Sequence, residues 1–365
     1  MKNEAVILQN MLTKVCNGIS VLLLIVLFEL VSIQIYRLPS SGGFFIIWII
    51  SLAASSLYLG YLSDRFSRKS CLLFTLVSGF LLVLLIGYFG FSRLFVLLLG
   101  LTFNPTPIAR ASIVDNFPHT SKVQLIVVTF IAQFLPWCAF SYLSEIPQTV
   151  FFIIMLISML INALFFAFFR DLRDAKVHFL AFTKVIHVGN RSKVYLTMSA
   201  CFIGQVVFFL SDARLDELSS NSTLYSLLGL GSLIGTSLGL LYRKTPHLSV
   251  LTLSYGMGLL FSVVPLFSTI SSNLDNLDFT YQTMLVANLG GFYLPFVYDA
   301  VLSSTSPAFR GTLCGVIELL ISMASVFALL FFMIFADSNI YLFTFISALF
   351  IIAMFLQRIG ERKLT

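Results

Sequence analysis

The stretch Gly60-Tyr61-Leu62-Ser63-Asp64-Arg65-Phe66-Ser67-Arg68-Lys69 is a dense group of charges in an otherwise apolar chain. Apolar segments flank it, at residues 43–59 before it and residues 71–91 after it. Segments of this length and composition are typical of helices that cross a membrane. The charged stretch therefore predicts a loop at which two spanning helices turn around.

The residue types in this stretch have definite physical uses. Gly60 lacks a Cβ atom and allows another helix to approach closely. Asp64 can face the positive N-terminal end of a neighbouring helix or pair with a basic side chain. Arg65, Arg68 and Lys69 favour the cytoplasmic side of the membrane. The simpler alternative is that the stretch only anchors the chain through these positive charges.

The spacing of these residues resembles the signature loop G-x-L-a-D-R-x-G-R-K between the second and third helices of the major facilitator superfamily. The matching residues are Gly60, Leu62, Asp64, Arg65, Arg68 and Lys69. Ser67 stands where the family usually has a second glycine. The resemblance implies an all-α membrane protein with twelve transmembrane helices in two six-helix bundles, and transport of a solute by alternating access.

The composition of the chain independently excludes an ordinary soluble domain. Of 365 residues, 58% are hydrophobic and 10% are charged, and the mean hydropathy is +0.98. A soluble domain of this composition would expose large apolar patches. The net charge of +6 is interpreted as a topology signal, so no nucleic-acid partner is expected. The five cysteines have no zinc-site spacing, and neither a metal nor a cofactor is expected.

Twelve apolar segments are long enough to be candidate spans, the fourth being interrupted by Asn104-Pro105-Thr106-Pro107. They cover residues 16–36, 43–63, 71–91, 94–113, 123–143, 149–169, 194–211, 223–242, 248–270, 281–301, 311–335 and 338–358. With an uncleaved first helix that starts inside, only Arg37, Arg93 and Arg214 of the 22 Lys and Arg residues fall outside. The positive-inside rule therefore predicts that both termini are cytoplasmic.

The longest polar stretch divides the chain into two halves. We expect an N-terminal six-helix bundle at residues 1–169, a cytoplasmic linker at 170–193 and a C-terminal six-helix bundle at 194–365. We expect a multi-pass monomer in a lipid bilayer, and the compact loops suggest a bacterial inner membrane as its location.

Ionisable residues inside spans are costly, so each is a candidate for function. Glu29 lies in the first span and Glu318 in the eleventh. A carboxylate in such a place can exchange a proton, and both are predicted proton-coupling residues. The alternative for each is a structural hydrogen bond to a neighbouring helix.

Further polar residues within spans are predicted to contact the solute or to join helices by hydrogen bonds. The candidate solute-binding residues are Gln133, Asn162, Gln205 and Asn288. The candidate gate consists of Gly60, Asp64, Arg65, Arg68, Lys69, Arg110 and Asp299, docking near Gly311. Arg110 is expected to pair with Asp64 or Asp115, with an anionic solute as the alternative partner.

These features predict proton-coupled uptake of a small-molecule solute. Prolines before basic loops, at Pro118 to Lys122 and Pro307 to Arg310, resemble metabolite–proton symporters, which implies an amino acid, an osmolyte or an organic acid. A drug or metabolite efflux antiporter is an alternative, although the span 123–143 has Pro136 but no glycine. A transport-inactive sensor is another. A lipid-modifying enzyme is not expected, because the four histidines form no catalytic motif.

Overall fold

The computed structural model describes residues 2–38, 43–170, 191–218, 222–241, 251–252, 254–256, 258–259, 293–335 and 339–362. Its helices are α1 (Lys2–Tyr36), α2 (Phe44–Arg65), α3 (Arg68–Phe89), α4 (Arg93–Thr102), α5 (Thr106–Asn116), α6 (Lys122–Cys138), α7 (Phe140–Glu145), α8 (Gln148–Ala167), α9 (Arg191–Leu218), α10 (Ser222–Leu241), the 3₁₀ turn η4 (Pro307–Phe309), α13 (Arg310–Phe335) and α14 (Asn339–Arg362). Residues 293–303 are also helical. Most of the expected ninth and tenth spans, together with residues 171–190 of the expected linker, lie outside the described residues.

Seven of the described segments are long and apolar enough to cross a membrane, by length and composition. Two shorter apolar helices, Lys122–Cys138 and Thr344–Gly360, add to them. Many apolar side chains on these helices are exposed, including Leu81 and Leu84 on α3 and Ile157 and Leu160 on α8. Exposed apolar faces of this extent suit contact with lipid chains.

The chain divides into two compact units. The first contains Met1–Pro136, Tyr142–Leu180 and Pro307–Leu319, and the second contains Trp137–Ser141, Ala181–Ser306 and Leu320–Thr365. The first ten residues of α13 therefore pack with helices from the start of the chain. The predicted domain boundary at residues 170–193 stays a prediction.

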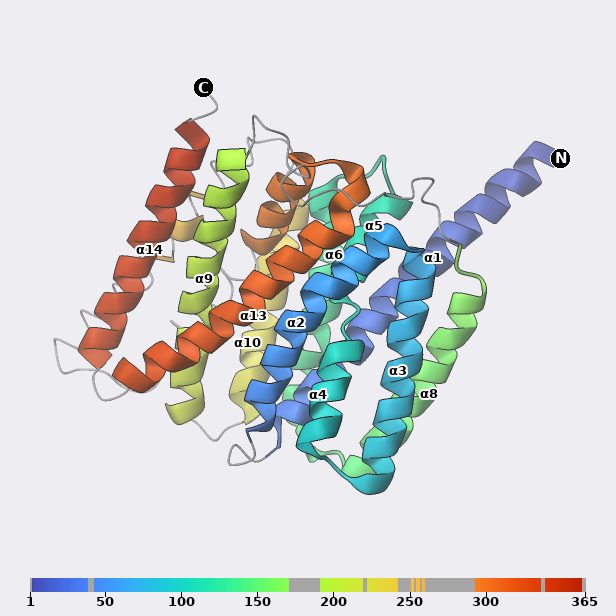
Figure 1. The fold of residues 1–365 in the computed structure, drawn as a ribbon, viewed down its shortest axis with the longest axis horizontal. Helices are drawn as coiled ribbons and strands as arrows, with labels where there is room; N and C mark the ends of the chain where they lie inside the picture. Colours follow the sequence, from blue (N-terminus) through green and yellow to red (C-terminus); the bar gives the residue numbers. More distant parts are fainter. Residues whose placement is uncertain are drawn as a thin grey trace. The chain divides into compact units, whose positions relative to one another are not determined.

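In the first unit, α1 packs against α5 and α8, while α3 packs against α4 and α8. Figure 1 shows α3 and α8 running side by side. Val21, Leu24 and Ile25 of α1 are completely buried in the core of this unit. Close packing of this kind, and not propensity alone, holds these helices together.

In the second unit, α9 and α14 run alongside one another over most of their length (Figure 1). The segment Trp137–Ser141 packs on α10, where Ser141 and Ser226 are joined by a hydrogen bond of 3.0 Å. Gly229 allows this contact, because a Cβ atom there would lie 2.6 Å from the backbone of Trp137. Gly229 therefore permits close packing between α10 and this segment.

The predicted interruption of the fourth span is present, since α4 ends at Thr102 and α5 begins at Thr106. Pro105 and Pro107 lack the N–H groups that a continuous helix would need here. Asn104 fills the gap by donating hydrogen bonds to Ser55 and Ser56 of α2, both at 2.9 Å. The break thus ties the α4–α5 span to α2.

Replacing Asn104 with alanine should lower the free energy of unfolding by about 1–3 kcal/mol, because it removes these buried hydrogen bonds. The melting temperature of the purified protein in detergent measures the effect. Thr102→Ala is the matched control, because the Thr102 hydroxyl bonds only within α4 at an exposed position. Equal melting temperatures for the two variants would contradict this role of Asn104.

Two sequence predictions of boundaries were wrong. The charged stretch is not a ten-residue loop, because α2 continues to Arg65 and α3 begins at Arg68. Ser67 replaces the glycine of the signature and caps α3, its hydroxyl accepting from the Ser70 N–H at 3.2 Å. The fifth span is not one helix, because α6 ends at Cys138, two residues beyond Pro136. Proline deprives the preceding turn of a hydrogen bond and weakens the helix there. The seventh span agrees with the prediction, since its apolar part covers Arg191–Leu210, although α9 itself continues to Leu218.

Candidate functional site

Helices α2 and α13 touch through their backbones at three glycines. A Cβ atom added to Gly311 would lie 2.6 Å from the carbonyl oxygen of Gly60, and one added to Gly60 would lie 3.1 Å from the Cα atom of Gly315. Larger side chains at these positions would separate the helices. The close approach that the sequence predicted at Gly60 is therefore present, with α13 as the partner.

Asp64 receives the first backbone N–H groups of α13. Its Oδ1 accepts from the Gly311 N–H at 2.9 Å, and its Oδ2 accepts from the Thr312 N–H at 2.6 Å and the Thr312 hydroxyl at 2.8 Å. The first turn of a helix has no internal acceptors for these groups, and its dipole favours a negative charge. Asp64 is 2% exposed, so solvent hardly competes for these bonds.

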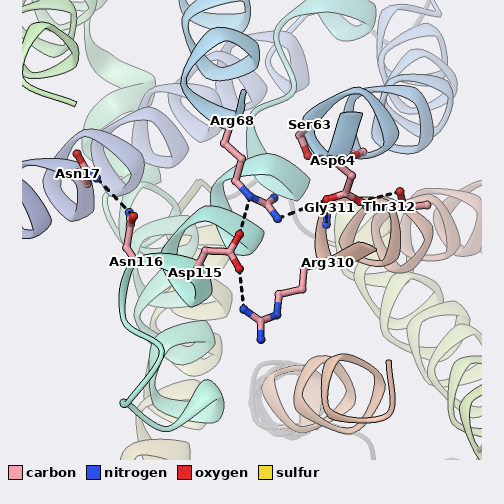
Figure 2. Close-up of polar contacts among 10 residues, drawn as sticks. Asn17, Ser63, Asp64, Arg68, Asp115, Asn116, Arg310, Gly311 and Thr312 are labelled. Carbon is pink, nitrogen blue, oxygen red and sulfur yellow. Dashed lines mark hydrogen bonds and ion pairs between the residues drawn. The ribbon is translucent and has the colours of Figure 1, made fainter. Parts of the chain in front are cut away.

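A second carboxylate, Asp115 at the end of α5, lies between two arginines. Its Oδ2 is 2.7 Å from Nε of Arg68, and its Oδ1 is 2.6 Å from Nη1 of Arg310. Arg68 also reaches Asp64 at 3.4 Å. Figure 2 shows this network, here named the Asp64 cluster: Asp64, Arg68, Asp115, Arg310 and the N–H groups of Gly311 and Thr312. Its two carboxylates and two guanidinium groups balance in charge.

The end of α8 is attached beside this cluster by two further residues. Lys69 donates to the Phe169 carbonyl oxygen at 2.6 Å. Asn17 of α1 donates to the Arg170 carbonyl at 2.8 Å and accepts from the Arg170 N–H at 3.1 Å. Asn17 also donates to Asn116 at 3.4 Å (Figure 2). Sequence reasoning did not select Asn17, because a single asparagine near the start of a helix carries no pattern.

Arg110 of α5 forms the second site, here named the Arg110 site. It is fully buried and makes an ion pair with Glu318 of α13. It also donates to the Gln133 side-chain oxygen, and its Nε donates to the Thr129 hydroxyl at 3.4 Å. The guanidinium carbon lies 4.0 Å from the centre of the Phe130 ring, which is a cation–π contact.

The two sites share the same two helices. α5 supplies Arg110 to one and Asp115 to the other, and α13 supplies Glu318 to one and Gly311 to the other. Glu318 lies seven positions after Gly311, which is about 10 Å along a helix axis. A movement of α13 that breaks one set of contacts therefore also acts on the other.

The expectation that Arg110 pairs with Asp64 or Asp115 was wrong, because its ion pair is with Glu318. The carboxylates of Asp64 and Asp115 pair with Arg68 and Arg310. The reason is geometric. Arg110 lies more than one turn before Asp115 on α5, deeper within the span, at the level of Glu318.

The structure places the remaining candidates separately. Glu29 is 4% exposed within α1. Gln205 of α9 donates to the Tyr293 hydroxyl, and Asp299 accepts from the Ser303 hydroxyl at 3.2 Å. Asn162 is fully buried in α8, and neither of its side-chain polar atoms has a hydrogen-bond partner among the residues that the structure describes.

Arg65 and Asn288 are the remaining gate and solute candidates. Arg65 is exposed, with its guanidinium 5.9 Å from the Phe66 ring. Asn288 lies outside the described residues. In the described part of the chain, no group of three or more His, Cys, Asp or Glu side chains is placed to hold a metal ion.

No model of a known protein family and no curated protein matches the sequence. Solved structures do match its fold over nearly the whole of both chains. The human organic anion transporter MFSD10 (TETRAN) has a TM-score of 0.76 at 16% identity, covering 95% of this chain and 99% of that chain. The E. coli fucose:proton symporter FucP has a TM-score of 0.71 at 11% identity, covering 96% of this chain and 99% of that chain.

A third match is a bacterial homologue of the iron transporter ferroportin in an outward-facing state, with a TM-score of 0.67 at 14% identity, covering 97% of this chain and 98% of that chain. A further FucP structure is described as that of a major facilitator superfamily transporter. In this fold twelve helices form two six-helix bundles, as the signature stretch predicted. The chain is a multi-pass integral membrane protein with the major facilitator fold.

Proposed function

We propose that this protein is a secondary active transporter that takes up a small solute together with a proton by alternating access. The observation that carries the proposal is the ion pair of Arg110 and Glu318, which lies inside an apolar helix bundle. Two charges so placed are costly to bury and are typical of solute and proton pathways. The full-length likeness to transporters supports the same class of function.

The pair can couple a proton to a movement of helices. While Glu318 is ionised, its attraction to Arg110 holds α13 against α5. When Glu318 takes up a proton, that attraction is lost and α13 is released. A proton therefore changes the relative stability of two arrangements of the helices, which is what coupling requires.

The Asp64 cluster supplies the closure that alternating access needs. Asp64 and the N-terminus of α13 form a contact that must break when this end of the bundle opens. Because α13 also carries Glu318, opening and proton uptake are linked through one helix. Gly60, Arg68 and Lys69 serve the same closure, and Arg65, Arg110 and Asp299 are proposed to assist it.

The similar transporters named above act on different solutes, and the solute is not taken from them. We propose an amino acid, an osmolyte or an organic acid, with Gln133, Gln205, Asn162 and Asn288 as contacts. We also propose that residues 170–193 link two bundles in the cytoplasm, that both termini are cytoplasmic, and that the protein is a monomer in a bacterial inner membrane.

Uptake into proteoliposomes should test this function. Purified protein is supplied with labelled amino acids, organic acids and osmolytes, with and without an inward proton gradient. At least one solute should accumulate only with the gradient. Glu318→Gln should lower its accumulation at least tenfold, because a glutamine cannot exchange the proton.

Glu29→Gln is measured in the same uptake assay as Glu318→Gln. Loss of accumulation in that variant alone would move proton coupling to α1, and accumulation that persists in both variants would limit both residues to packing. A folded wild-type protein that accumulates no solute from the panel would contradict proton-coupled uptake.

A further inference from the structure

We infer that Arg110 is the binding group for a substrate carboxylate, and that Glu318 is an internal carboxylate that occupies the substrate's place. The substrate class is a small organic monocarboxylate. The inference rests on the proposed transport function for the role of that anion as cargo, and it deepens that function by naming the chemistry of the Arg110 site.

The guanidinium of Arg110 is held in place by groups other than Glu318. Thr129 and Gln133 accept its N–H groups, and Phe130 lies against its face. All three belong to one helix, α6, within two turns. A guanidinium fixed in this way keeps its orientation when a different carboxylate replaces Glu318, so little entropy is lost on binding.

Glu318 has the features of an occupant that can leave. It comes from a different helix, α13, whereas Thr129, Phe130 and Gln133 come from α6. Its side chain is 12% exposed, whereas that of Arg110 is 1% exposed. Gln133 is also partly exposed. The accessible side of the Arg110 site is thus formed by two residues. Glu318 is the residue that would leave, and Gln133 carries a neutral amide that can donate a hydrogen bond to a carboxylate.

Charge balance determines what can enter. With Glu318 ionised, the Arg110 site is neutral, and a second carboxylate would face a like charge. With Glu318 protonated, one positive charge remains in a low-dielectric bundle, and one negative charge compensates it. A neutral solute would leave Arg110 uncompensated, and a cation would be repelled. A monocarboxylate that enters with one proton keeps the site neutral.

The neighbouring charged groups do not alter this balance. Those closest along α5, α13 and the adjoining helix ends are the four charged members of the Asp64 cluster: Asp64, Arg68, Asp115 and Arg310. They consist of two acids and two bases that pair with one another. The donors that Asp64 and Asp115 hold are not available to a substrate anion, so the anion is drawn to Arg110.

Equilibrium binding separates this inference from transport. The full-length protein in lipid nanodiscs is titrated with acetate, lactate and benzoate, and with acetamide, lactamide and benzamide as neutral analogues, between pH 6 and 8. At least one acid should bind, with affinity rising up to tenfold for each unit of pH decrease, because binding takes up one proton. Its amide should bind at least tenfold more weakly.

Two variants make the test specific. Glu318→Gln should bind the same acid at least tenfold more tightly than wild type at pH 8, with no dependence on pH, because the competitor is already neutral. The double variant Arg110→Gln/Glu318→Gln should lose binding while keeping its melting temperature near that of Glu318→Gln. Glu318→Gln keeps the size of the side chain and leaves one positive charge at the site, and the double variant removes that charge and is neutral there.

Several outcomes would overturn the inference. These are equal affinity of Glu318→Gln and wild type, binding that survives in the double variant, and failure of all three acids to bind folded Glu318→Gln protein. Acid binding as expected but without uptake into proteoliposomes would refute transport and leave the anion site standing. Gradient-driven uptake of another solute, with no acid bound, would refute the anion site and leave transport standing.

Discussion

Replacing Arg110 with methionine should destabilise the folded protein by about 3–5 kcal/mol, because it leaves the Glu318 carboxylate without its partner in the bundle. The double variant Arg110→Met/Glu318→Gln should lose much less stability, since no unpaired charge remains. The difference between single and double variants isolates the ion pair from the packing of the Arg110 stem.

The measurement is the midpoint of thermal unfolding in detergent for wild type, Arg110→Met, Glu318→Gln and the double variant. Arg110→Met should have the lowest midpoint of the four. If the double variant unfolds at or below the midpoint of Arg110→Met, the ion pair does not contribute as the structure indicates.

Replacing Asp64 with alanine should free the start of α13. The N–H groups of Gly311 and Thr312 would lose the only charged acceptor that the structure gives them, at a cost of about 1–3 kcal/mol for each unsatisfied group. Hydrogen–deuterium exchange in the peptide that contains residues 310–316 should become at least tenfold faster. Solute accumulation should fall with it, because one end of the bundle no longer closes.

Arg65→Ala is the matched control. Arg65 neighbours Asp64 in the same charged stretch, but its side chain is exposed and lies over Phe66. Because Arg65 is proposed to assist closure through its positive charge and not through a contact with α13, its removal should leave exchange in residues 310–316 unchanged. Equal exchange rates for Asp64→Ala and wild type would show that the contact with α13 is not what closes this end.

The charged stretch made the fold predictable because its residues act through properties that can be read from the local sequence. Glycine at position 60, a carboxylate at 64 and basic residues at 65, 68 and 69 act through size and charge at fixed spacing, and apolar segments on both sides determine that they lie between two spans. The break at Asn104 to Pro107 was predictable for the same reason, since two prolines within three residues remove two of the backbone N–H groups that a continuous helix needs.

The sites were only partly predictable, because their partners are distant in sequence. Arg110 and Glu318 were both selected as charges within spans, but their pairing depends on the packing of α13 against α5, which no spacing encodes. The resemblance to the signature loop also did not predict the short turn at Ser67. Ser67 is a helix cap and needs no positive φ angle, so the turn is two residues long where a longer loop was expected.

The role of Asp64 was predictable from electrostatics, whereas that of Asp115 was not. A carboxylate that faces a helix N-terminus was the expected use of Asp64, and the structure identifies that helix as α13. The second carboxylate, Asp115, could not be assigned from the sequence, because Arg68 and Arg310 reach it from two different helices.

The most direct test of proton coupling through Glu318 compares net accumulation with exchange for one transported solute. In proteoliposomes with an inward proton gradient, wild type should accumulate the solute above its external concentration. Glu318→Gln should fail to accumulate it but should still exchange labelled for unlabelled solute across the membrane. Accumulation by Glu318→Gln equal to that of wild type would contradict the account, because coupling would then not pass through the Arg110–Glu318 pair.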